Sequence, residues 1–306
     1  MIIKAANWNL IGSVANNPNV EFGDIMFLNI PNTKTIFLAF REHNSAGQWA
    51  ITVCKITNFG IDWVYDSTII AGQYQFVGAP WLFLADNGDL HIYYDSEPLA
   101  SYLGAYGREW ITIQGKNGKT GDWNKYGIKV ASRDKNIGKL CRDRMASVIN
   151  LGNNRIIVVT EGVEDSPLGG VYANVLRGIQ SFDGGNTWDY NGRKIVYQFF
   201  KDSGSGRRYN AYTPIGIIIG NGPVGVVFCT DEDFGGKPDR SDEDVTKRRT
   251  LIKFIRTLNN FETWGHKKSF WTNGNQAYAS GMLEFKFNNV IVTIDHFGMK
   301  RFLRYK

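Results

Sequence analysis

The sequence predicts an all-β protein, a single domain over residues 1–306 made of repeated four-stranded antiparallel sheets. Three observations support this prediction. Aromatic residues make up 14% of the chain and there are 34 glycines, a composition typical of strands joined by tight turns. Apolar runs of strand length follow one another, and no long segment has a helical period. A turn motif that ends in tryptophan recurs about every sixty residues, which indicates a repeat architecture.

The most complete turn motif is SFDGGNTW, residues 181–188. Ser181 and Asp183 can accept hydrogen bonds from backbone amides, the two glycines allow positive φ, and Trp188 offers a large apolar side chain. We therefore expect this turn to fold its repeat and to take no part in chemistry. Related stretches are ITNFGIDW (56–63), NGKTGDW (117–123) and TLNNFETW (257–264).

Each repeat carries strand-like runs on either side of such turns. The second run of each repeat spans 35–42, 90–97, 155–162, 224–232 and 289–296, and the third runs span 49–56, 109–114, 174–182 and 251–258. Radial repetition of four-stranded antiparallel sheets is a β-propeller, and counting the units gives five blades. The last unit (277–305) lacks an outer strand, so we expect the segment 7–13 to supply it and close the ring.

Charge, cysteine content and hydropathy narrow the function classes. The net charge of +6 comes from scattered basic residues, and the clusters at 206–208 and 247–249 are interpreted as solvated loops, so we expect no nucleic-acid partner. No apolar run reaches the roughly 20 residues of a membrane helix, and no signal peptide is visible. Cytoplasmic, phage-borne and exported proteins stay open as alternatives. Three cysteines without CxxC spacing argue against a disulfide framework or a zinc site. We expect a monomer without cofactors.

Acidic residues stand at the end of every second run. They are Glu42, Asp95, Glu97, Glu161, Asp231, Glu232, Asp233 and Asp295. The first strands begin at the same face of such a fold and add Asp24, Arg142, Arg144, Tyr212 and Tyr278. Two carboxylates that flank a bond are what glycoside cleavage needs, because one protonates the leaving oxygen and the other attacks or stabilises the sugar. Metal binding by residues 231–233 is a weaker alternative, because no dedicated loop accompanies them, and we expect no metal site.

Several of these stretches resemble a known family. SFDGGNTW resembles the Asp-box of the sialidase-like propellers, S-x-D-x-G-x-T-W. Shorter pieces resemble glycoside hydrolase family 93, the exo-acting α-1,5-L-arabinanases, whose propeller has six blades. They are FRE (40–42), YYDSE (93–97), CRDRM (141–145), IIVVTEG (156–162) and VVFCTDED (226–233), with Tyr278 in QAYASG (276–281).

This resemblance implies a retaining, exo-acting glycosidase for an arabinan-like or related glycan. Glu161 and Glu232 would be its catalytic pair, with Tyr278 as a third catalytic residue. The residues expected to bind the sugar are Asp24, Arg41, Tyr94, Glu97, Arg142, Arg144, Tyr212, Asp231 and Asp295. Two alternatives stay open: a sialidase-type enzyme that clamps an acidic sugar with arginines, and a non-catalytic glycan-binding propeller.

Overall fold

A computed structural model describes the greater part of the chain. The described residues are 15, 17–56, 63–74, 76–97, 110–116, 122–123, 128–131, 142–163, 174–200, 209–220, 222–234, 250–257, 261–271, 277–286, 289–296 and 299–305. These residues form strands and two single-turn 3₁₀ helices, η2 (Tyr190–Gly192) and η3 (Glu232–Phe234). The prediction of an all-β protein is confirmed. In the described part of the chain no helix is long and apolar enough to cross a membrane.

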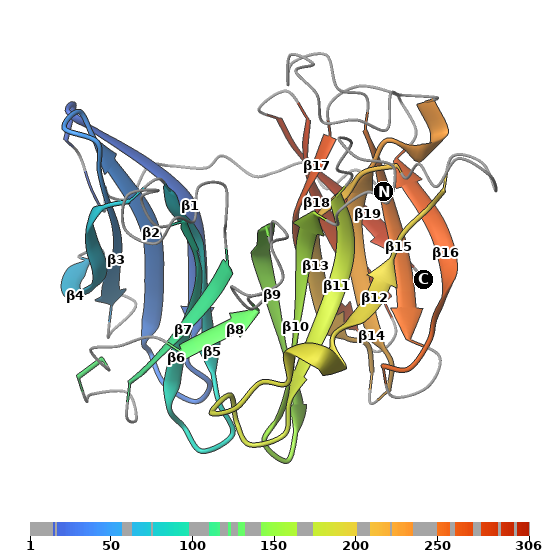
Figure 1. The fold of residues 1–306 in the computed structure, drawn as a ribbon, viewed down its shortest axis with the longest axis horizontal. Helices are drawn as coiled ribbons and strands as arrows, with labels where there is room; N and C mark the ends of the chain where they lie inside the picture. The colour runs from blue at the N-terminus through green and yellow to red at the C-terminus, as the bar shows by residue number, and fades with distance from the viewer. Residues whose placement is uncertain are drawn as a thin grey trace.

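The strands form five antiparallel sheets in chain order, and Figure 1 shows β1–β4 at the left and β16 at the right, with the labels β17, β18 and β19 between them in this view. The first sheet holds β1 (Val20–Asn29), β2 (Ile36–Asn44), β3 (Gln48–Ile56) and β4 (Val64–Gln73), and the second holds β5 (Phe76–Leu84), β6 (Leu90–Glu97), β7 (Trp110–Lys116) and β8 (Ile128–Ala131). The third holds β9 (Arg142–Gly152), β10 (Arg155–Val163), β11 (Asn174–Ser181) and β12 (Lys194–Tyr197). The fourth holds β13 (Ala211–Ile218), β14 (Val224–Thr230), β15 (Leu251–Thr257) and β16 (Trp264–Trp271), and the fifth holds β17 (Ala277–Lys286), β18 (Asn289–His296) and β19 (Met299–Tyr305).

The core lies between the faces of neighbouring sheets. Phe37 and Val53 pack against Leu82 and Ile92 between the first and second sheets. Equivalent apolar clusters join the second sheet to the third, the third to the fourth and the fourth to the fifth. The second strands are buried on both faces, which explains why β6 and β14 are buried along their whole length. This stacking of four-stranded sheets is consistent with a propeller.

The closure of the predicted ring is not shown. The fifth sheet has three strands among the described residues, as the sequence predicts, but the segment 7–13 that was expected to complete it lies outside them. No element of the first sheet packs extensively against the fifth sheet in the described part of the chain. The count of five blades in a closed ring therefore stays a prediction.

The turn at 181–188 has the hydrogen bonds that its sequence predicts. Asp183 Oδ1 accepts from the amides of Asn186 and Thr187 at 3.0 and 2.9 Å, and Ser181 Oγ accepts from the Gly185 amide at 2.8 Å. Trp188 packs against the core between the second and third sheets. Ser181 pairs with the first residues of β10, at the opposite end from Glu161, so this turn lies away from the carboxylates.

Candidate functional site

A cavity of about 200 Å³ lies where the first strands of four sheets meet. We call it the first-strand cavity. Its lining is mostly apolar and comes from β1, β5, β9 and β13: Asp24, Ile25, Met26, Ala79, Pro80, Trp81, Met145, Ala146, Thr213, Pro214 and Ile215. In each of these strands a β-bulge sets two residues opposite one residue of the second strand. Recurrent bulges thus shape the wall of the cavity.

The first residue of each bulge has a left-handed backbone. The φ angles are 53° at Asp24, 44° at Ala79, 54° at Met145 and 49° at Thr213, which is uncommon for residues other than glycine. This conformation leaves the backbone amides of three of these residues to be bound by carboxylates of the preceding sheet. Asp24 Oδ2 accepts from the Ala79 amide at 3.1 Å, Asp95 from the Met145 amide at 3.0 and 3.1 Å, and Glu161 Oε2 from the Thr213 amide at 2.7 Å.

Glu161 lies beside the first-strand cavity, because its partner Thr213 is part of the cavity wall. It is 2% exposed near the end of β10, directly opposite Arg144 in the register of β9 and β10. Arg144 Nε donates to Glu161 Oε1 at 2.6 Å. Two of the predicted site residues are therefore brought together here, and both carboxylate oxygens of Glu161 are hydrogen-bonded.

Asp24 and Arg41 form a second charged pair at this cavity. Arg41 Nε lies 2.9 Å from Asp24 Oδ2, and Arg41 Nη2 donates to Glu21 Oε1 at 2.9 Å. The guanidinium group also lies 5.4 Å from the centre of the Trp49 ring. Arg41 is fixed by these contacts, and the ion pair with it lowers the pKa of Glu21.

Glu232 has a different environment from Glu161. The chain leaves β14 at Thr230 and turns into η3, so Glu232 is not part of the strand. Its buried carboxylate pairs with Lys253 on β15 and Lys267 on β16, the latter at 3.0 Å, and accepts from the hydroxyl of Tyr197 on β12. Burial, together with the hydrogen bond to Glu232, raises the pKa of Tyr197. These partners stand on third and fourth strands, whereas those of Glu161 stand on first strands.

The other predicted site residues fall into three groups. Tyr94 packs in the core between the first two sheets, and Tyr212 packs between the last two. Glu97 is buried at the end of β6, and Asp231 accepts two hydrogen bonds from Asn210, at 2.8 and 2.9 Å. The side chains of Arg142, Tyr278 and Asp295 lie outside the described residues, although the backbones of Tyr278 and Asp295 are paired in the register of β17 and β18.

Two kinds of site residue were missed at the sequence level. The bulge amides of Ala79, Met145 and Thr213 bind carboxylates of the preceding sheet, but their conformation depends on strand register and no local motif marks it. Lys253 falls within the predicted run 251–258 and Lys267 within none of the predicted runs, and nothing in their spacing points to Glu232.

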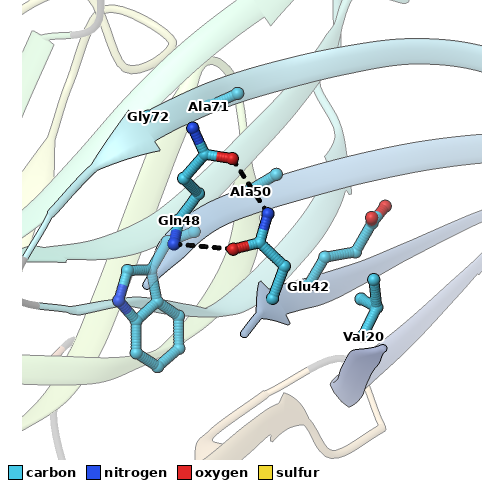
Figure 2. Close-up of a pocket in the computed structure, with 8 residues that line it drawn as sticks. Val20, Glu42, Gln48, Ala50, Ala71 and Gly72 are labelled. Carbon is cyan, nitrogen blue, oxygen red and sulfur yellow. Dashed lines mark hydrogen bonds between the residues drawn. The ribbon is translucent and has the colours of Figure 1, made fainter. Parts of the chain in front are cut away.

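A second cavity, of about 270 Å³, lies on the first sheet. Figure 2 shows Glu42 and Gln48 beside Ala50 and Ala71. The side chains of Asn44 and Gln48 are joined at 2.9 Å, and no described residue donates a hydrogen bond to the Glu42 carboxylate. The cavity offers polar groups without the paired carboxylate and arginine of the first-strand cavity.

Metal and disulfide chemistry find no support in the described residues. Within them no three His, Cys, Asp or Glu side chains are placed to hold a metal ion. Cys54 and Cys229 are buried free thiols, and burial, assisted by the charges of Glu42 and Asp66, raises the pKa of Cys54. Cys141 lies outside the described residues.

Comparison of the sequence with protein-family models and with curated proteins gives no match. Comparison of the structure does give matches. An α-L-arabinanase of Penicillium chrysogenum, solved with arabinobiose, has a TM-score of 0.62 at 16% identity, over 92% of this chain and 75% of that one. An α-L-arabinofuranosidase of Fusarium graminearum has a TM-score of 0.60 at 16% identity, over 94% of this chain and 75% of that one. A Hadza microbial sialidase has a TM-score of 0.57 at 14% identity, over 87% of this chain and 52% of that one. The fold is therefore similar to that of these enzymes, and a further structural neighbour is described as a GH93 α-L-arabinofuranosidase of Fusarium graminearum.

Proposed function

We propose that this protein is a glycoside hydrolase that acts on an arabinan-like or related glycan at the first-strand cavity. The observation that carries the proposal is the position of Glu161, a buried carboxylate bound by Arg144 at 2.6 Å and by the amide of the cavity residue Thr213 at 2.7 Å. Structural similarity to arabinan-degrading enzymes supports the substrate class. The cavity has a volume of about 200 Å³, and an exo mode of action is what the resemblance implies.

We assign Glu161 the role of nucleophile, because both of its contacts are hydrogen bonds to an ionised carboxylate. In a retaining reaction the glycosidic C–O bond breaks as a Glu161 oxygen bonds to the anomeric carbon, and a second carboxyl group gives its proton to the leaving oxygen. Water then attacks that carbon, its proton passes to the second carboxylate, and Glu161 is released. The resemblance alone makes Glu232 this second group. In the structure its carboxylate accepts from Lys253, Lys267 and Tyr197, so the acid role requires one of these contacts to give way to a proton.

The test is sugar release from a panel of arabinan, other plant and bacterial glycans and sialosides. We expect the wild type to release a sugar, and Glu161→Gln to lower the rate at least about 100-fold, the lower limit of a typical acid–base or nucleophilic contribution. Glu262→Gln is the control, because Glu262 is an exposed carboxylate paired with Lys194. A wild type that binds a glycan without cleaving it would favour the non-catalytic alternative, and an unimpaired Glu161→Gln would refute the assignment.

A further inference from the structure

Asp24 differs from the residues that hold the same position in the other sheets. The left-handed bulge residue is Ala79 in the second sheet, Met145 in the third and Thr213 in the fourth, and all four residues line the first-strand cavity. Asp24 is the charged member of this set. Its side chain is 34% exposed, so its carboxylate can meet a ligand in the cavity.

The two oxygens of Asp24 have different surroundings. Oδ2 takes both of the contacts that hold the side chain, with Arg41 Nε at 2.9 Å and the Ala79 amide at 3.1 Å. No described residue donates a hydrogen bond to Oδ1. One oxygen therefore anchors the carboxylate, and the other is free to accept hydrogen bonds from a ligand.

Two glycines make room for this arrangement. A Cβ atom at position 23 would lie 2.4 Å from Arg41 Nη2, and one at position 78 would lie 2.8 Å from Asp24 Oδ2. The same Cβ at position 78 would also lie 2.5 Å from the Cζ atom of the Phe76 ring. A side chain at position 23 or 78 would clash with the ion pair and displace it. Glycine at both positions therefore allows Asp24 and Arg41 to lie together at the cavity.

The charges around the cavity disfavour an anionic ligand. Arg41 is already paired with Glu21 and Asp24, and Arg144 with Glu161. An acidic sugar would meet the negative charge of Asp24 while both arginines are engaged, and breaking their ion pairs has a cost. Hydroxyl groups, in contrast, can donate to a free carboxylate oxygen without any rearrangement.

We infer that Asp24 is a specificity-determining residue: its Oδ1 atom accepts hydrogen bonds from the hydroxyls of a neutral sugar, and its charge excludes sugars that carry a carboxylate. The inference rests on the proposed function, because it assigns a substrate class to the same cavity. It is distinct from the catalytic assignment of Glu161, because it concerns binding.

Asp24→Asn tests the inference. The amide oxygen of the new side chain can still accept from the Ala79 amide and lie beside Arg41, which turns its NH₂ group towards the cavity and replaces an acceptor by a donor. Calorimetry measures the binding of arabinobiose and of a matched pair of sugars, the neutral methyl glucoside and the acidic methyl glucuronoside. We expect the wild type to bind the neutral sugars and not the glucuronoside. Asp24→Asn should weaken neutral binding roughly 10- to 100-fold, as expected for a hydrogen bond to a charged group, and improve binding of the glucuronoside.

Glu21→Gln is the matched control, because Glu21 also pairs with Arg41 but does not line the cavity. It should leave neutral binding unchanged. Gly78→Ala, which crowds Asp24, should reproduce the loss seen in Asp24→Asn.

Equal binding of neutral sugars by the wild type and Asp24→Asn would overturn the inference, and so would a preference of the wild type for the glucuronoside. If Asp24→Asn cleaves glycans with an unchanged KM, the inference fails while the proposed function stands. A wild type that neither binds nor cleaves any sugar refutes the proposed function itself.

Discussion

At the scale of single residues, Glu161 and Glu232 show how similar sequence contexts lead to different surroundings. Both stand near the end of a second run, and the resemblance makes them a catalytic pair of acid/base and nucleophile. Glu161 stays in its strand and contacts Arg144 and Thr213, whereas Glu232 lies beyond the end of β14 in a 3₁₀ turn and contacts lysines on outer strands. The local sequence pattern predicts that an acidic residue stands near the end of each of these strands. It does not predict which residues the Glu232 side chain contacts, because those contacts depend on where β14 ends.

The buried pair of Glu232 and Lys253 leads to a prediction about stability. Lys253 is 3% exposed, and after Glu232→Gln its remaining carboxylate partner is Asp233 at 2.9 Å. We expect this substitution to lower the free energy of unfolding by at most about 3–5 kcal/mol, the usual cost of breaking a buried ion pair, because Asp233 compensates part of the loss, and urea denaturation measures the change. Replacing both groups, as Glu232→Gln with Lys253→Met, should recover most of the loss.

The same double variant tests the catalytic assignment of Glu232. If Glu232 is the second catalytic carboxylate, the double variant is stable but inactive, which is the result we expect. A double variant that is both stable and active would show that Glu232 serves the ion pairs only. The Glu262→Gln control should change neither stability nor activity by a measurable amount, because an exposed ion pair contributes little.

At the scale of secondary structure, the strands were largely predictable. The second runs at 90–97 and 289–296 match β6 and β18, and the third run at 49–56 is close to β3. These elements follow from local apolar patterns and turn residues. The bulges at Asp24, Ala79, Met145 and Thr213 could not be predicted, because they depend on the register between two strands.

The turn at 181–188 should make stability depend on pH. Burial by itself raises the pKa of Asp183, but the hydrogen bonds from Thr187, Ser181 and Asn186 outweigh it and lower the pKa below the ordinary 3.8. A depressed pKa in the folded state means that the carboxylate stabilises the fold above about pH 4, and that this contribution is lost as the pH falls through the folded-state pKa. The difference in unfolding free energy between the wild type and Asp183→Asn should therefore shrink below about pH 4. A difference that is the same at pH 3 and pH 6 would contradict this account.

Gly162 in β10 gives a second prediction at this scale. A Cβ there would lie 2.2 Å from Asp143 Oδ1, and Asp143 is fully buried between Arg177 at 2.9 Å and Arg193 at 2.7 Å. Gly162→Ala should lower the free energy of unfolding by at least about 1–3 kcal/mol, the cost of overpacking. Gly222→Ala is the control, because its nearest neighbour is 3.9 Å away, and it should be nearly neutral in the same denaturation experiment.

At the scale of the whole molecule, the repeat of sheets accounts for the position of the site. Four of the five sheets present their first strand to the same cavity, and the carboxylates Asp24, Asp95 and Glu161 each bind a bulge amide in the next sheet. The sequence predicted that acidic residues from several repeats gather at one face, and these three do so. It could not predict that their partners would be backbone amides. Stacked sheets tied together in this way make a preorganised wall for a ligand.

The most direct test of the account is a crystal structure of the protein with the sugar that it releases from the glycan panel. We predict that the sugar lies in the first-strand cavity, with a hydroxyl within hydrogen-bond distance of Asp24 Oδ1 and its anomeric carbon next to Glu161. A sugar bound instead at the cavity beside Glu42 and Gln48, with the first-strand cavity empty, would contradict the central claim.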